Sequence, residues 1–213
     1  MKVNISAGLV LLVATLNAWA VEAPAATTLG TCVACHGEQG QGNAALGAPS
    51  LAGQHPVYLA QQIRGFKTGS RGYDPKDTYG AQMRTIVANI DEAEIERLAL
   101  HYSRLEPLRS QVVVGEQATR GRELYQGTCA SCHGPEGEGF AYLKAPNLRI
   151  LDASYLDRQL TYYVQGLRGS GGHADQLGLW MRGISLQING DADRKAIIDY
   201  ITSLSAKGGG SKN

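Results

Sequence analysis

Apolar side chains recur three and four residues apart along several stretches of the chain, which is the spacing of an amphipathic helix. No stretch alternates between apolar and polar residues as a half-buried strand does. The pattern therefore predicts an all-α fold. The clearest stripes are Leu59, Ile63 and Phe66; Ile95, Leu98, Ala99 and Tyr102; Leu156, Leu160, Tyr163 and Leu167; and Ile197, Ile198, Ile201 and Leu204.

A polar pair marks the start of the second of these stripes. Asp91 is followed three residues later by Glu94, directly before the apolar positions. In a capping box, the first side chain accepts the backbone N–H of the second residue, and the second side chain reaches back to the first N–H. We expect this reciprocal arrangement at Asp91 and Glu94.

The stripes belong to an internal repeat. Residues 32–37 (CVACHG) recur 97 positions later as residues 129–134 (CASCHG). The offset becomes 98 at the two methionines, as one residue inserted between Gly169 and Met181 would produce. Self-similarity of this kind identifies repeated structural units, so we predict two copies of one helical domain. Other matched pairs are Pro49 and Pro146, Tyr58 and Tyr155, Gln62 and Gln159, Arg71 and Arg168, and Tyr102 and Tyr200.

The ends of these domains follow from the repeat and from composition. Residues 1–20 combine Lys2, a short apolar run and an A-x-A site, which is typical of a cleaved signal peptide. An uncleaved anchor helix is the alternative. Both interpretations predict that the chain is exported to the periplasm. The expected segments are a signal peptide at 1–20, domains at 21–105 and 120–206, a linker at 106–119 and a flexible tail at 207–213.

The charge balance bears on partners. Twenty basic and nineteen acidic residues leave a net charge of +1, whereas a nucleic-acid-binding domain is usually strongly basic. We therefore expect no nucleic-acid partner. Domains of about 90 residues often need stabilisation beyond their own core, and a large apolar cofactor would provide it.

All four cysteines of the chain lie in the two C-x-x-C-H motifs. Positions i, i+3 and i+4 share one face of a helix, so both thiols and the histidine of a motif point together. This spacing is typical of c-type haem attachment, with the thiols bonded to the haem and the histidine to its iron. Two covalently bound haem c groups are therefore predicted, at Cys32, Cys35 and His36 and at Cys129, Cys132 and His133.

A C-x-x-C pair also occurs in redox disulfides, structural zinc sites and the disulfides of exported proteins. None of these requires a histidine directly after the second cysteine. A zinc site would need neither a signal peptide nor a repeat at this spacing. These alternatives are therefore less favoured than haem.

Two methionines are the expected sixth iron ligands. Apart from Met1, the chain has only Met83 and Met181, which lie 47 and 48 residues after the two motif histidines. A lone methionine usually fills a core, but equivalent places in two repeats favour a ligand role. We expect each in a loop-like stretch before the last helix of its domain. His173, eight residues before Met181, is the rival ligand.

Four further residues are candidates for a supporting role. The carbonyls of Pro49 and Pro146, each 13 residues after a motif histidine, could accept its Nδ1–H and fix the ring. Arg71 and Arg168 could pair with haem propionates, with a solvated surface arginine as the alternative.

Taken together, these motifs resemble those of the dihaem cytochromes c4, which are tandem class I cytochrome c domains. The resemblance is carried by residues 32–37, 49–54, 129–134 and 146–148 and by the two methionines. It implies two helical domains, each wrapped around one covalent haem, with the haems facing each other across a pseudo-twofold interface. It also implies a periplasmic one-electron carrier per haem, not an enzyme. Its partners would be a quinol-oxidising complex such as quinol-cytochrome c reductase and a terminal oxidase or reductase.

Other roles remain open for the same pattern. The dihaem electron-accepting subunit of a periplasmic dehydrogenase, as in flavocytochrome c sulfide dehydrogenase, has similar architecture. A dihaem peroxidase and a gas sensor are less favoured, because each needs an open iron position. Peripheral membrane association is compatible with the N-terminal segment. Residues 121–125 (GRELY) resemble the N-terminal helix of a cytochrome c domain, but residues 24–28 lack its glycine and aromatic. We therefore expect that helix to be short or altered in the first domain.

Overall fold

A computed structural model describes residues 22–108 and 117–204. Within these ranges the chain is helical, and its only extended pairing is one bridge between Asn43 and Ala48. The all-α prediction is confirmed. No helix in the described ranges has the length and apolar character needed to cross a membrane. The predicted signal peptide (1–20), residues 109–116 of the predicted linker (106–119) and the whole predicted tail (207–213) lie outside the described residues.

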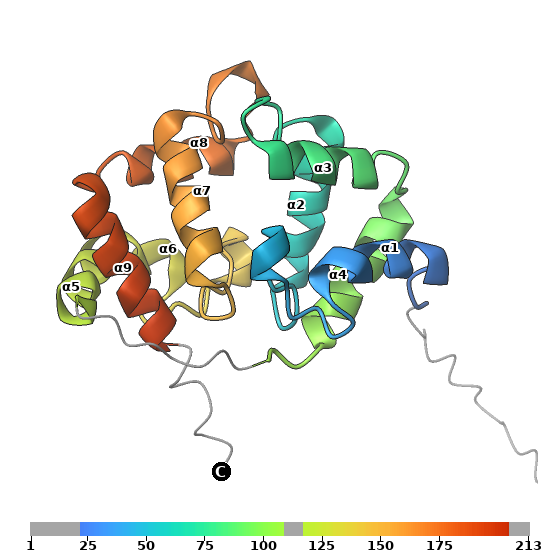
Figure 1. Cartoon of the computed structure of the whole chain (residues 1–213), viewed down its shortest axis with the longest axis horizontal. Helices are drawn as coiled ribbons and strands as arrows, with labels where there is room; N and C mark the ends of the chain where they lie inside the picture. The colour runs from blue at the N-terminus through green and yellow to red at the C-terminus, as the bar shows by residue number, and fades with distance from the viewer. Residues whose placement is uncertain (1–21, 109–116, 205–213) are drawn as a thin grey trace, which may run out of the picture.

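The helices fall into two successive sets (Figure 1). The first domain holds α1 (Ala26–His36), η1 (Ala44–Leu46), α2 (Pro56–Thr68), α3 (Thr78–Val87) and α4 (Glu92–Arg104). The second holds α5 (Ala118–Thr128), α6 (Ala130–His133), η2 (Ala141–Leu143), α7 (Ala153–Gln165), η3 (Gly171–His173), α8 (Gln176–Ser185) and α9 (Gly190–Leu204).

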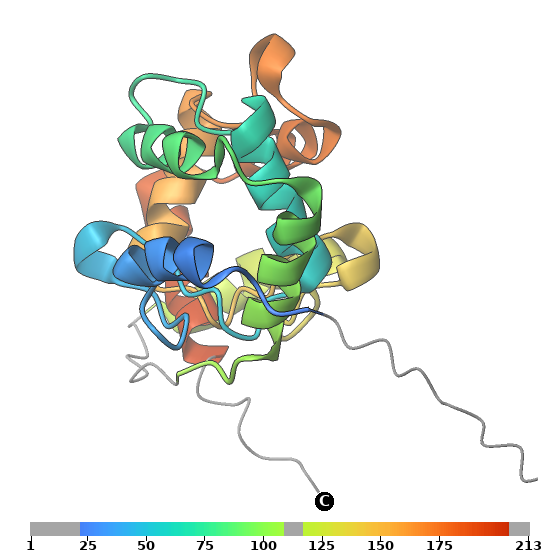
Figure 2. The same ribbon diagram turned by 90° about the vertical axis from the view of Figure 1, so that its right-hand side faces the viewer.

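The two domains lie side by side, with α2 and α7 facing each other at the centre (Figure 1). Each has its own core, built from the stripes predicted from the sequence. One core joins α2 to α4 through Leu59, Phe66, Leu98 and Tyr102, and the other joins α7 to α9. In the first domain α3 lies on the opposite side from α1 (Figure 2). Helices α1 and α3 therefore lie on opposite sides of the interior of the first domain.

Two glycine contacts hold α3 and α8 in place. A Cβ on Gly72 would lie 2.5 Å from the Gly80 carbonyl oxygen of α3, and a Cβ on Gly169 would lie 2.2 Å from that of Gly178 in α8. Only a glycine lets the loop backbone approach the helix this closely. The two contacts span eight and nine residues, which places the inserted residue of the repeat in the loop that contains η3.

The domains differ at their N-terminal helices. Helix α5 begins at Ala118, eleven residues before Cys129 and inside the expected linker, whereas α1 begins at Ala26, only six before Cys32. Helix α5 crosses α9 so closely that a Cβ on Gly121 would lie 1.8 Å from the Ala196 carbonyl oxygen. The two helices each have 11 residues, but the part that precedes the motif is shorter in the first domain, so the helix is altered there.

The capping-box prediction is wrong for one of its two members. Asp91 accepts the Glu94 N–H (N···O 2.7 Å), as expected. Glu94, however, accepts the Ala25 N–H at 2.8 Å and the Arg97 Nε–H at 2.7 Å. The segment before α1 lies across the start of α4 and offers donors that the local motif does not reveal.

Polar contacts join the two domains. The buried Gln54 amide donates to the Asn147 carbonyl at 3.0 Å and accepts the Asn147 N–H at 2.8 Å. His55 Nε2 lies 2.9 Å from the Glu138 carbonyl oxygen. Because buried polar groups must be paired, these bonds fix the domains in one relative position.

Candidate functional site

Each domain has a pocket in which the motif residues of one repeat meet. The structure therefore brings each predicted set together, and Arg71 of the first set also lines the second pocket. The predicted residues lining the first pocket are Cys32, Cys35, His36, Pro49, Arg71 and Met83, and those lining the second are Cys129, Cys132, His133, Pro146, Arg168 and Met181.

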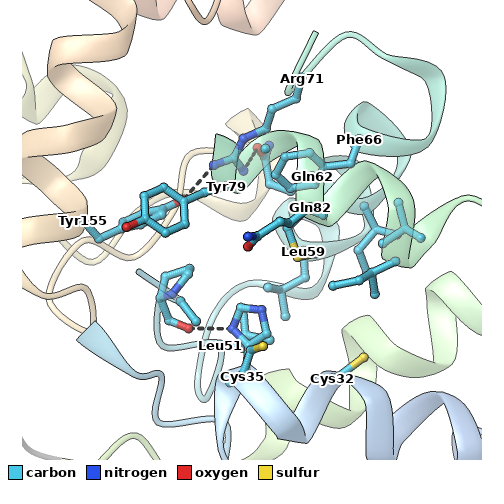
Figure 3. Close-up of a pocket in the computed structure, with 18 of the residues that line it drawn as sticks. Cys32, Cys35, Leu51, Leu59, Gln62, Phe66, Arg71, Tyr79, Gln82 and Tyr155 are labelled. Atoms are coloured by element: carbon cyan, nitrogen blue, oxygen red, sulfur yellow. Dashed lines mark hydrogen bonds between the residues drawn. The ribbon is translucent and has the colours of Figure 1, made fainter. Parts of the chain in front are cut away.

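The first pocket has two chemically different ends (Figure 3). Cys32 and Cys35 lie at one end, and Arg71, Gln62 and Tyr155 lie at the other. The wall between them is mainly apolar. Its members include Leu51, Leu59 and Phe66.

The histidines are held as neutral rings. His36 Nδ1 lies 2.9 Å from the Pro49 carbonyl oxygen, and His133 Nδ1 lies 3.4 Å from that of Pro146. Burial lowers the pKa of each histidine, although the carbonyl contact acts in the opposite direction. A neutral ring that donates from Nδ1 leaves Nε2 as the metal-binding nitrogen.

The cysteines sit on helices that end at these histidines. Cys32 and Cys35 share α1, whereas Cys129 separates α5 from α6, which carries Cys132. Burial raises the pKa of Cys32, and burial followed by the nearby Cys132 raises the pKa of Cys129 to about 11. The catalytic thiol of a redox disulfide usually has a lowered pKa, so this environment disfavours that alternative.

The methionines correct one prediction. Met83 lies within α3 and Met181 within α8, not in loop-like stretches. The side chains of Asp77 and Asp175 accept N–H groups from the first turn of each helix, at 2.8 and 2.6 Å. Such N-cap residues are a sequence signal for a helix start, and glycines in the first turn obscured it.

His173, the rival ligand, is placed elsewhere. It is exposed, belongs to η3 and does not line either pocket. Its ring stacks on Tyr73 of the first domain, with ring centroids 5.0 Å apart. The structure therefore gives His173 a contact between domains.

Arg71 and Arg168 meet where the domains join. Arg71 donates to Gln62 at 2.8 Å within its own domain and to Tyr155 at 2.9 Å in the other. Arg168 donates to Gln159 at 2.5 Å and, across the interface, to Gln62 at 2.8 Å. Arg71 also reaches Gln159, at 3.1 Å. The sequence repeat contained Gln62, Gln159 and Tyr155 but gave no sign of this shared role.

This cluster tests whether the pockets suit haem. Arg71 and Arg168 are only 9% and 8% exposed. Neither has a carboxylate in ion-pair contact in the described ranges, and Arg71 Nε is buried without a partner. Buried cations require anions close by. Each pocket is mainly apolar, with two thiols at one end and, at the other, arginines that lack an ion-pair partner among the described residues. This lining fits a haem with its carboxylates.

Comparison with known proteins agrees with this geometry. The cytochrome c family model matches residues 23–102 and 118–205. The chain is 32% identical to the thiosulfate dehydrogenase electron acceptor of Thiomonas intermedia (strain K12), over 91% of this chain and 90% of that protein. It is 31% identical to cytochrome c4 of Azotobacter vinelandii, over 81% of this chain and 84% of that protein. The solved structure of Acidithiobacillus ferrooxidans cytochrome c4 superposes with a TM-score of 0.67 and 28% identity, covering 82% of this chain and 99% of that one.

Proposed function

Because this chain belongs to the cytochrome c family, we propose that it relays single electrons in the periplasm. The donor is a quinol-oxidising complex or a dehydrogenase, and the acceptor is a terminal oxidase or reductase. The chain has two tandem cytochrome c domains that bind two covalent haems, and it is an electron-transfer protein, not an enzyme. The observation that carries the proposal is that each pocket gathers two cysteines, a histidine and a methionine from one repeat.

Some residues of each pocket attach the haem, and others bind its iron. The cysteines of each motif attach the haem, and the axial ligands are His36 with Met83 and His133 with Met181. The haem supplies the one-electron redox step when bound. We assign domains to residues 21–105 and 120–206.

The surrounding side chains tune that step. The Pro49 and Pro146 carbonyls orient the histidine rings through Nδ1–H. Arg71 and Arg168 bind haem carboxylates from the polar end of each pocket. A methionine ligand favours the reduced iron, and a filled sixth position leaves no iron site for substrate. Together these features support a carrier over a peroxidase or a gas sensor.

The periplasmic location rests on residues 1–20, with their positive start, apolar run and A-x-A site. Covalent haem attachment is consistent with an exported chain. Peripheral membrane association belongs to the same proposal, should this segment remain attached.

A second candidate is the electron acceptor of a periplasmic dehydrogenase. The 32% identity with the thiosulfate dehydrogenase electron acceptor favours it. The two roles differ in their donor, so stopped-flow reduction by a quinol-oxidising complex and by a periplasmic dehydrogenase separates them. Fast reduction by the dehydrogenase together with stable co-purification supports the acceptor role.

Replacement of either methionine tests the ligand assignment. Met83→Ala and Met181→Ala should each open one iron, lower its reduction potential and leave the other haem unchanged. Spectroelectrochemical titration of the haem-loaded protein measures both potentials, and the unmodified domain is the internal control. Unchanged spectra in both variants would show that the methionines are not ligands.

A further inference from the structure

The first pocket contains a cation that belongs to the second domain. Arg158 lies on α7, yet it lines the first pocket together with Arg71. Its Nη2–H donates to the Gly47 carbonyl oxygen at 2.5 Å. Its guanidinium lies over the Tyr79 ring, 4.4 Å from the ring centroid.

Arg158 is incompletely satisfied at this position. Its Nε is buried and has no hydrogen-bond partner. It forms no ion pair within residues 22–108 and 117–204. Asp77 lines the same pocket, but its Oδ1 accepts the Gly80 N–H. A charged donor removed from water is costly unless an acceptor binds it, so this position calls for an anion within the pocket.

The first domain contributes Arg71 to the second pocket, but it has no cation at the position equivalent to Arg158. The repeat pairs Arg158 with Gln61, 97 residues earlier, which lines the second pocket. Gln61 is uncharged, and its Nε2–H donates to Asp175 Oδ2 at 3.2 Å. The two pockets therefore differ in what the opposite domain contributes.

We propose that Arg158 binds a carboxylate of the first domain's haem, so that this cofactor site is completed across the domain interface. The inference rests on the proposed function, because it requires haem in the first pocket. A role limited to clamping Gly47 would account for the Nη2 contact, but not for the buried Nε in the pocket wall. Loss of the positive charge should disfavour the form of the haem that carries the additional electron.

The test is Arg158→Gln in the full-length, haem-loaded protein. Proton NMR follows the reduction of each haem separately, with signals assigned by contacts to Leu51 for the first pocket and Leu148 for the second. The ratio of reduced to oxidised first haem at a fixed applied potential should fall about tenfold, the order of magnitude for one partly buried charge. For a one-electron couple this is about 59 mV. The second haem should change at least threefold less than the first.

Three further variants serve as controls for charge, for position and for folding. Arg158→Lys keeps the charge and should show less than half of the change, measured as the shift in potential. Gln61→Ala removes the counterpart side chain of the second pocket without altering charge and should leave the first haem unchanged. Arg158→Met, which keeps the apolar stem over Tyr79, replaces Arg158→Gln should the latter not fold.

Three results overturn the proposal: an unchanged first haem, an equal change in both haems, or an equal change in Arg158→Gln and Arg158→Lys. Failure of the proposed function is distinct from these. It would appear in the unmodified protein as the lack of two reversible one-electron steps.

Discussion

The two domains attach haem through the same motif, but their N-terminal segments pack differently against the last helix of the domain. In the second domain α5 crosses α9 through a glycine contact, and Arg120 pairs with the buried Asp193. In the first domain α1 begins only six residues before Cys32, and Glu94 binds the backbone of Ala25 instead. The repeat thus preserves the pocket and not the helix crossing, which indicates that haem attachment tolerates an altered N-terminal helix.

The glycine crossing provides the largest expected difference between domains. Gly121→Val places side-chain atoms against the Ala196 carbonyl oxygen and should destabilise the second domain by about 3 kcal/mol. The first domain should keep its stability, so that thermal unfolding followed by circular dichroism separates into two transitions. Gly127→Ala is the matched control on the same helix, because a Cβ there meets nothing within 4 Å.

A single cooperative transition shifted as a whole would show that the domains unfold together. An unchanged unfolding curve for Gly121→Val would show that α5 does not pack on α9 as described.

The buried carboxylates give a smaller difference. Glu94→Gln removes the charge that binds Arg97 and weakens the acceptor for Ala25, so it should cost the first domain about 1–2 kcal/mol. Asp193→Asn should cost the second domain less than about 1 kcal/mol, because the Arg120 side chain is 61% exposed and screened by water. Chemical denaturation measures both values. A larger loss of stability for Asp193→Asn than for Glu94→Gln would contradict this difference between the two domains.

Acid sensitivity should hardly distinguish the two domains, because a motif histidine is buried in each. Burial lowers the pKa of His36 and His133 below the ordinary value of 6.5, and iron coordination also excludes the proton. The unfolded chain therefore binds more protons than the folded one as pH falls below about 6.5, and stability declines from there toward the folded-state pKa values. Unfolding midpoints measured between pH 7.5 and about 5 check this. Stability that rises with acidity would contradict it.

The sequence predicted the parts of the site that depend on local spacing. The two C-x-x-C-H motifs, the repeat and the pair Met83 and Met181 can all be found by counting along the chain. The helical setting of the methionines was missed, because glycines in the first turns weakened the helical pattern, although Asp77 and Asp175 are good N-caps.

Contacts between domains could not be predicted. Gln54 donates to a backbone carbonyl 93 residues away, and Arg158 reaches a carbonyl 111 residues away. Such partners depend on how two cores are placed against each other, and no local pattern encodes that placement. The repeat did pair Gln62 with Gln159 and Tyr58 with Tyr155, so it identified these residues without their shared contact.

Carbon monoxide titration of the fully reduced, haem-loaded protein tests most directly whether both irons are closed by methionine. No carbon monoxide should bind near neutral pH, and both haems should show the far-red thioether-to-iron absorption when oxidised. Binding of one carbon monoxide per chain, with that absorption lost from one haem, would contradict the account and identify an open iron.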